Sequence, residues 1–127
     1  MSQRPKAHTR VLLALDGGAL GRDLLAMVLR RCVRLCPRLD ILLVNPPREA
    51  TSVLAVLLLR LEHGGIDYRV ASARGDMGEE ILRYLSRYRG ISALALADPA
   101  QLSVAARTLI ESKGQEIIFL SAPEQGG

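Results

Sequence analysis

The chain has 127 residues, of which 49% are hydrophobic, and a formal net charge of +4. This length fits one domain with one core, because chains divide into several domains only when they are much longer. The composition includes three Tyr, one Phe and no Trp, which argues against binding of single-stranded nucleic acid, since that activity depends on aromatic side chains that stack on bases.

Short apolar runs alternate with segments of helical periodicity along the whole chain. The apolar runs predict strands near 10–16, 39–44, 66–73, 91–97 and 116–121. The first run is apolar at every position, which is typical of a parallel strand covered on both faces, whereas the third alternates polar with apolar residues as an edge strand does. We therefore predict a doubly wound α/β fold, with a five-stranded parallel sheet in the order 3-2-1-4-5 and helices on both faces.

Four helices are expected between these strands. The first, near 20–36, has a broad apolar stripe and ends at Pro37. The second, near 51–63, is apolar almost all round, which predicts that it is deeply buried or covered by a partner.

The third and fourth helices have recognisable start signals. The third is expected to begin at Asp76, with Glu79 as the acid of a capping box. The fourth is expected to begin at Asp98-Pro99, a cap followed by proline at the first helical position. The side chains expected to face the core are Ile81, Leu82, Leu85 and Tyr88 in the third helix, and Leu102, Ala105, Ala106, Leu109 and Ile110 in the fourth.

Arginines and cysteines gather around the end of the first expected helix. Arg30, Arg34 and Arg38 are spaced by four residues, which would form a basic stripe on a helix face; a solvated face is favoured over a site for phosphate or an acidic partner. Cys32 and Cys36 do not form a zinc-binding pattern with the two histidines of the chain. We interpret them as small core residues in a reducing compartment.

The ends of the chain are expected to be loose, with a flexible arm over 1–9, the domain over 10–121 and a tail over 122–127. The first residues are polar and do not resemble a signal peptide. The longest apolar run, 53–59, is far shorter than the roughly 20 residues of a membrane span. We therefore expect a cytoplasmic protein without membrane insertion.

Polar groups follow the expected strands, at the edge of the sheet where ligands bind in open α/β folds. They are Asp16, Asn45, Arg74, Gly75, Asp76, Asp98 and Ser121. The sequence Leu15-Asp16-Gly17-Gly18 resembles the Val-Asp-Gly-Ser motif that closes the first strand of the universal stress protein family. The segment 75–82 (Gly-Asp-Met-Gly-Glu-Glu-Ile-Leu) is similar to the Gly-Asp-Pro-x-x-x-Ile segment of that family. The resemblance covers roughly residues 10–121.

Members of that family that bind ATP or AMP have a glycine-rich loop after the fourth strand. It reads Gly, two residues, Gly, nine residues, Gly, then Ser or Thr. Here the strand is followed by Asp98 and Pro99, with no glycine before Gly114. Proline lacks a backbone N–H that could hold a phosphate, and Asp98 would repel one. The resemblance thus implies a member that lacks the ATP loop and has no cofactor.

Several residues would still form a nucleoside site by resemblance. Asp16 and the backbone of Val44 would contact the nucleoside, Gly17 and Gly18 would keep the turn tight, and Asp98 would lie at the same rim. In the competing interpretation, Asp16 only caps the turn and binds nothing. A metal ion between Asp16 and Asp98 is disfavoured, because two carboxylates are too few ligands for a hard cation.

The chain has no Ser/His/Asp or Cys/His set that suggests nucleophilic catalysis, so no enzymatic activity is expected. The main hypothesis is a non-catalytic universal-stress-type protein, acting as a dimeric stress-response or regulatory interaction module. Its dimer would form by pairing of the last strand, 116–121, as in the family, and its regulatory protein partner is not specified by the sequence. The alternative is a regulator that binds AMP, adenosine or another small metabolite near Asp16, with Arg74 in place of the glycine loop. A hydrolase or pyrophosphatase of the wider superfamily is the third hypothesis.

Overall fold

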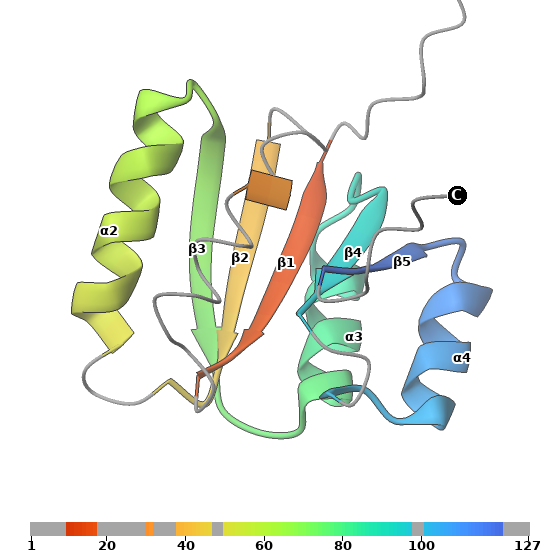
Figure 1. The fold of residues 1–127 in the computed structure, drawn as a ribbon. Coiled ribbons are helices and arrows are strands. Elements are labelled where there is room, and N and C mark those ends of the chain that lie inside the picture. The colour runs from red at the N-terminus through yellow and green to blue at the C-terminus, as the bar shows by residue number, and fades with distance from the viewer. Residues whose placement is uncertain (1–9, 18–29, 32–37, 47–49, 98–100, 121–127) are drawn as a thin grey trace, which may run out of the picture.

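The computed structural model describes residues 10–17, 30–31, 38–46, 50–97 and 101–120. One five-stranded parallel sheet runs through the molecule in the order β3-β2-β1-β4-β5 (Figure 1). Its strands are β1 (Val11–Asp16), β2 (Arg38–Val44), β3 (Asp67–Ala73), β4 (Ala93–Leu96) and β5 (Glu116–Phe119). The predicted fold class and strand order are confirmed.

Burial follows the position of each strand in the sheet. In β1 every residue from Val11 to Leu15 is buried, and β4 is buried throughout. In β3 the residues alternate between exposed and partly buried until Val70, which is also exposed. β3 therefore forms one edge of the sheet, as its mixed sequence predicted, and β5 forms the other.

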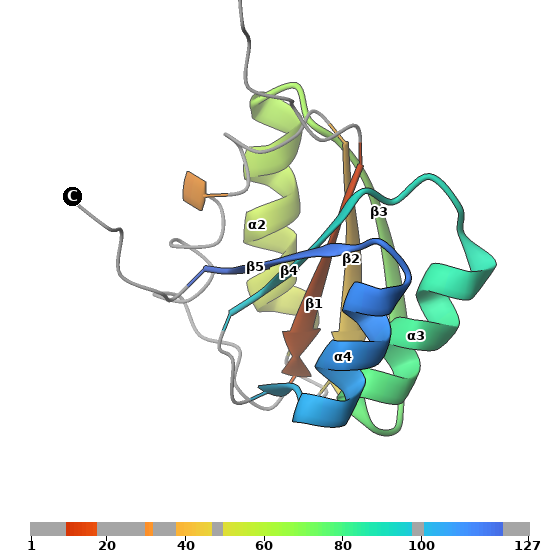
Figure 2. The same cartoon turned by 90° about the vertical axis from the view of Figure 1, so that its right-hand side faces the viewer.

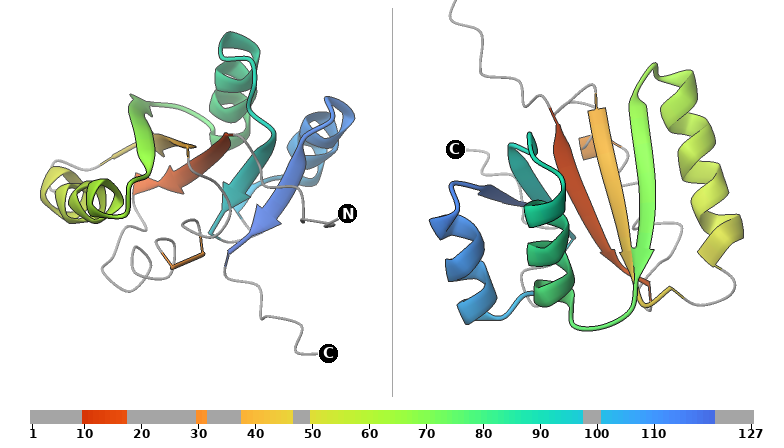
Figure 3. Two further views of the ribbon diagram at one scale, coloured as in Figure 1. Left: turned by 90° about the horizontal axis from the view of Figure 1, so that it is seen from above. Right: turned by 180° about the vertical axis from the view of Figure 1, so that it is seen from behind.

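Helices cover both faces of the sheet (Figures 1 and 3). α2 (Ala50–His63) lies on one face, where its Leu54, Leu57 and Leu61 join the first core cluster. α3 (Met77–Arg87) and α4 (Val104–Ser112) lie on the opposite face, where their side chains pack in the second cluster. The sheet residues of the second cluster include Leu12, Leu42, Leu94 and Leu96.

Of the two alternatives predicted for α2, deep burial is wrong, and cover by a partner stays a prediction. Leu57 and Leu61 are buried, but Val56 and Leu59 on the other side of the helix are 59% and 56% exposed. One face of α2 packs on the sheet. No other described element covers its outer face, so that face is exposed.

The expected start of the fourth helix is wrong. α4 begins at Val104, and its N-cap is Ser103, whose hydroxyl accepts a hydrogen bond from the Ala106 N–H at 3.1 Å. Leu102 is buried before the helix begins, whereas Leu109, predicted to be in the core, is 52% exposed. Ala105 is exposed as well.

The first expected helix lies outside the described residues except for Arg30 and Arg31, which are helical. Cys32, Cys36, the arm 1–9 and the tail 122–127 lie outside them too. The predicted arginine stripe is not a helix face, because Arg38 begins β2. Among the helices that the structure describes, none combines the length and apolar character needed to cross a membrane.

Candidate functional site

The carboxyl edge of the sheet brings together some of the predicted rim residues. Asp16 ends β1 and is the register partner of Val44, which ends β2. Asp16 is half-buried and Val44 is buried. The two residues named for nucleoside contact are therefore neighbours at the end of β1 and β2.

Gly17 sits where the chain leaves β1 and crosses the end of β2. A Cβ atom at this position would lie 2.4 Å from Cα of Pro46 and 2.5 Å from the carbonyl oxygen of Asn45. Both atoms belong to the backbone, so a side chain cannot be admitted by rotating a neighbour. Glycine is therefore needed here for close approach of two chain segments.

Asn45 ties the end of β2 to the loop that precedes α3. Its side-chain amide donates a hydrogen bond to the carbonyl oxygen of Gly75 at 2.8 Å, and its side-chain oxygen accepts one from the Gly75 N–H at 3.0 Å. Asn45 has a φ of 55°, and Gly75 one of 142°. Asparagine tolerates the left-handed region better than most residues, and Gly75 adopts a backbone conformation that side chains rarely allow.

The motif 75–82 positions the start of α3. Asp76 is the N-cap, and its carboxylate accepts a hydrogen bond from the Glu79 N–H at 3.0 Å, as predicted. Gly78 packs so closely on α4 that a Cβ atom would lie 2.7 Å from Cβ of Ala106. The motif residues visible here therefore have structural roles, and none of these contacts requires a ligand.

Gly18, Asp98 and Ser121 lie outside the described residues. The carboxyl edge is thus represented by Asp16, Gly17, Val44 and the Asn45–Gly75 pair. Within the part of the chain that the structure describes, no group of three or more His, Cys, Asp or Glu side chains could hold a metal ion.

A buried charge cluster lies at the opposite, amino edge of the sheet. Asp40 in β2 is only 1% exposed. Its carboxylate accepts hydrogen bonds from Arg10 Nη1 at 3.1 Å, Arg69 Nη2 at 2.9 Å and the Tyr84 hydroxyl at 2.6 Å. Charge-assisted bonds of this kind offset the cost of removing a carboxylate from water.

The elements around Asp40 explain this arrangement. Asp40 pairs in register with Leu12 of β1 and Arg69 of β3, and its side chain points to the face that α3 covers. Arg10 directly precedes β1, and its carbonyl oxygen accepts hydrogen bonds from the N–H and hydroxyl of Ser92. The backbone of Arg10 is therefore fixed at the position from which its side chain reaches Asp40.

Two pKa values reflect the cluster. Burial, followed by the hydrogen bond to Asp40, raises the pKa of the Tyr84 hydroxyl above its ordinary value. The hydrogen bond to Asp40 raises the pKa of Arg69 as well. Both shifts make the Tyr84 hydroxyl and the Arg69 guanidinium hold their protons more strongly, so both remain donors to Asp40.

Sequence reasoning did not find this cluster. The signal in the sequence was Asp40, a single carboxylate inside the apolar run 39–44. Burying an unpaired Asp is very costly, so its presence there indicates that other residues pair with it. The identity of its partners depends on the register between β2 and β3 and on the end of α3, and neither can be read from one segment.

The fold can be compared with known proteins at this point. Neither the known family models nor the curated proteins gave a match to this sequence. Among solved structures, the chain is similar to a protein from the universal stress protein family from Burkholderia pseudomallei. The two share 19% sequence identity with a TM-score of 0.62, and the match covers 91% of this chain and 97% of that one. This chain therefore has the α/β fold of that protein, as the sequence motifs led us to expect.

A second similar structure is the shikimate dehydrogenase of Mycobacterium tuberculosis, with 15% identity and a TM-score of 0.53. The match covers 89% of this chain but 44% of the dehydrogenase. The similarity is thus to one part of a larger enzyme, and it shows that the same arrangement of sheet and helices occurs in proteins of different function.

Proposed function

We propose that this chain is a non-catalytic universal-stress-type protein that lacks the ATP loop and acts as a dimeric regulatory module. Two observations support the proposal: the fold likeness to the Burkholderia protein over nearly its whole length, and the outer edge of β5. The outer edge of β5 is the observation that supports a dimer. No described strand pairs with this edge, although β5 contains Ile117, Ile118 and Phe119, all only partly buried.

β5 is the outermost strand on its side of the sheet (Figure 2), so one side of its backbone has no neighbouring strand among the described residues. The Leu120 N–H donates to the Leu96 carbonyl oxygen of β4 at 2.7 Å. Because backbone groups alternate in direction along a strand, the N–H and C=O groups of Ile117 and Phe119 point away from β4. Exposed apolar edges of this kind are usually covered in stable proteins, and a second copy of β5 would cover this one.

Replacing Ile117 with proline tests this interface. Proline removes the outward N–H that the partner strand would use, while the β4–β5 ladder keeps its own donors. Sedimentation velocity at micromolar concentration should show a dimer for the unmodified protein and a monomer for Ile117→Pro. Ile117→Ala loses the same packing against the second core cluster but keeps the N–H, so it should remain dimeric.

Two results would remove the proposed interface. One is a monomeric unmodified protein at those concentrations. The other is Ile117→Pro that remains folded by circular dichroism and still sediments as a dimer.

The second candidate function is a regulator that takes AMP, adenosine or a similar metabolite at the carboxyl edge. The adjacency of Asp16 and Val44 in the β1–β2 register favours it. In this case the Asp16 carboxylate accepts a hydrogen bond from a ligand hydroxyl or amine, a charge-assisted contact that typically contributes about 1.5–3 kcal/mol.

Isothermal titration with AMP, adenosine and ATP, with and without Mg²⁺, distinguishes the two candidates. If the regulator hypothesis is right, a nucleoside ligand binds with a Kd on the order of micromolar, and Asp16→Asn weakens it roughly tenfold or more. Asp67→Asn at the other edge should leave the affinity unchanged. Absence of binding to every compound would eliminate the regulator hypothesis for nucleotides and leave the dimeric module.

A further inference from the structure

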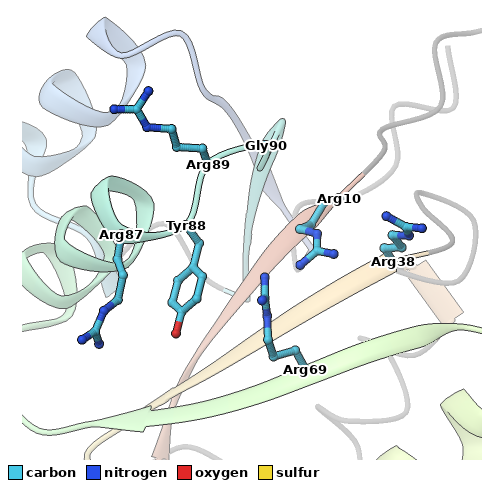
Figure 4. Close-up of a pocket in the computed structure, with 7 residues that line it drawn as sticks. All are labelled: Arg10, Arg38, Arg69, Arg87, Tyr88, Arg89 and Gly90. Atoms are coloured by element: carbon cyan, nitrogen blue, oxygen red, sulfur yellow. The ribbon is translucent and has the colours of Figure 1, made fainter.

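An arginine-lined hollow opens at the amino edge of the sheet, on the face that α3 covers. Its volume is about 440 Å³, within the range typical of small-molecule sites. The residues that line it are Arg10, Arg38, Arg69, Arg87, Tyr88, Arg89 and Gly90 (Figure 4). We call it the arginine hollow. It lies at the end of the strands opposite to Asp16, so it is separate from the carboxyl edge.

The side chains around the arginine hollow have two arrangements. Arg10, Arg38 and Arg69 lie together over the starts of the strands, whereas the Arg87 and Arg89 side chains extend from the end of α3 and point away from these three (Figure 4). The Arg87 and Arg89 side chains are exposed and have long flexible stems. The hollow thus has a floor formed by Arg10, Arg38 and Arg69, and two exposed arginines at its rim.

The positive charge in the arginine hollow exceeds what its carboxylate neutralises. Asp40 forms ion pairs with Arg10 and Arg69. Arg38, Arg87 and Arg89 form no ion pair with any carboxylate in the described part of the chain, although Asp67 faces Arg38 across the β2–β3 ladder. One buried carboxylate needs one or two cations for compensation. The other three arginines are therefore not explained by the stability of Asp40.

The floor of the arginine hollow is held in place before any ligand arrives. The carboxylate of Asp40 fixes the guanidinium groups of Arg10 and Arg69, and the Arg69 guanidinium stacks over the Tyr88 ring at 4.5 Å. Tyr88 in turn packs on Tyr84, with ring centroids 4.4 Å apart. Fixed donors lose little conformational entropy on binding, which favours affinity.

The end of α3 slightly opposes an anion at this place. The carboxyl end of a helix carries roughly half a negative charge. Arg87 lies in the last turn of α3 and offsets it. The several arginine charges outweigh this contribution, so the local potential remains positive.

We propose that the arginine hollow binds a compact anion that carries several phosphate groups, such as an oligophosphate or a small metabolite with adjacent phosphates. Arginine recognises phosphate oxygens through paired N–H donors, which makes a cluster of arginines a better match for phosphate than for a point anion. We infer several phosphates rather than one because Arg38, Arg87 and Arg89 have no carboxylate partner among the described residues, and a ligand with several negative charges would balance them.

The chemistry of the lining favours a small ligand over nucleic acid. The one aromatic ring of the arginine hollow, Tyr88, is already covered by Arg69, so no platform is available for an unpaired base. The arginines surround a hollow of limited volume and do not follow an extended groove. A compact ligand can contact Arg10, Arg38 and Arg69 at once, because these three lie together over the starts of the strands.

Isothermal titration with sodium tripolyphosphate, at low ionic strength and without divalent cations, tests the proposal. We expect saturable binding, with pyrophosphate binding more weakly and inorganic phosphate more weakly still. Arg38→Gln should lower the affinity for tripolyphosphate at least fivefold, and addition of Arg87→Gln and Arg89→Gln should lower it further. None of these three side chains contacts Asp40, so the variants should fold normally, which the thermal midpoint in the absence of ligand would check.

Arg60→Gln is the matched control, because it removes the same charge from the end of α2, on the opposite face of the sheet. It should change the affinity less than twofold. Equal losses in Arg60→Gln and Arg38→Gln would show nonspecific attraction to a basic protein and overturn the proposal. Absence of saturable binding would overturn it too, as would an oligonucleotide of mixed sequence that binds more tightly than tripolyphosphate. None of these three outcomes depends on the oligomeric state or on ligands at Asp16.

Discussion

Replacing Asp40 with alanine should lower the free energy of unfolding by about 3 kcal/mol, because the change removes the centre of a buried cluster. The Tyr84 hydroxyl is buried and would lose its acceptor, which alone typically costs about 1–3 kcal/mol. Arg10 and Arg69 would lose their ion pairs, but their side chains are 23% and 44% exposed and can reach water. Urea unfolding at neutral pH measures the effect.

Asp67→Ala is the matched control for this prediction. It removes an exposed carboxylate from the same edge of the sheet and should change the stability by less than about 0.5 kcal/mol. If the two alanine variants unfold at similar urea concentrations, the Asp40 cluster does not stabilise the fold and our interpretation of it is wrong.

Tyr84→Phe isolates one bond of the cluster. At neutral pH it should cost about 1 kcal/mol, the usual net value of a hydrogen bond. The folded protein holds the Tyr84 proton more strongly than the unfolded chain does, since the pKa is raised in the fold. This contribution is complete below the ordinary tyrosine pKa of about 10 and is lost as the pH rises through the folded-state pKa. Stability should therefore fall above about pH 10, and less steeply in Tyr84→Phe.

The strands could be predicted to within about two residues because burial on both faces leaves a direct trace in the sequence. An apolar run such as 11–15 fits few other structures, and the polar alternation in 67–70 identified β3 as an edge. The start of α4 was wrong for a local reason. Asp98-Pro99 and Ser103 are both good signals for the start of a helix. Leu102 lies between them and is buried, and burial of one residue is a tertiary effect that the local sequence does not reveal.

The two edges of the sheet differ in what the sequence reveals. At the carboxyl edge, Asp16 and Gly17 stand next to each other in a recognisable turn, so local reasoning places them correctly. At the amino edge, the candidates Arg38 and Arg69 lie in β2 and β3 and Arg10 directly precedes β1, so these residues meet only through the register of the sheet. A scattered set of arginines thus becomes a concentrated positive site only after folding.

Anion binding and fold stability are coupled at the amino edge. Arg10 and Arg69 both hold Asp40 and line the arginine hollow, so an anion there would share two donors with the buried carboxylate. Tripolyphosphate should therefore raise the thermal midpoint of the protein, since a ligand that binds only the folded state stabilises it.

Gly17→Ala should destabilise the protein by about 3 kcal/mol, the upper range for overpacking in a close contact. The added Cβ would overlap backbone atoms of Asn45 and Pro46, so β1 and the end of β2 would have to separate. The same separation would move Asp16 away from Val44 and disturb the Asn45 contact with Gly75. Thermal unfolding measures the loss of stability, which we expect whether or not the carboxyl edge binds a ligand.

Gly64→Ala provides the control, because it adds the same methyl group where space exists. The nearest heavy atoms would be the carbonyl oxygens of Arg60 and Leu61 at 3.5 and 3.6 Å, which is ordinary contact. This variant should be unchanged or more stable by less than about 1 kcal/mol, since alanine restricts the unfolded chain. If Gly17→Ala were equally stable, the crossing at Pro46 would have to be looser than this structure shows. Close approach of the two backbone segments would then not explain the glycine at this position.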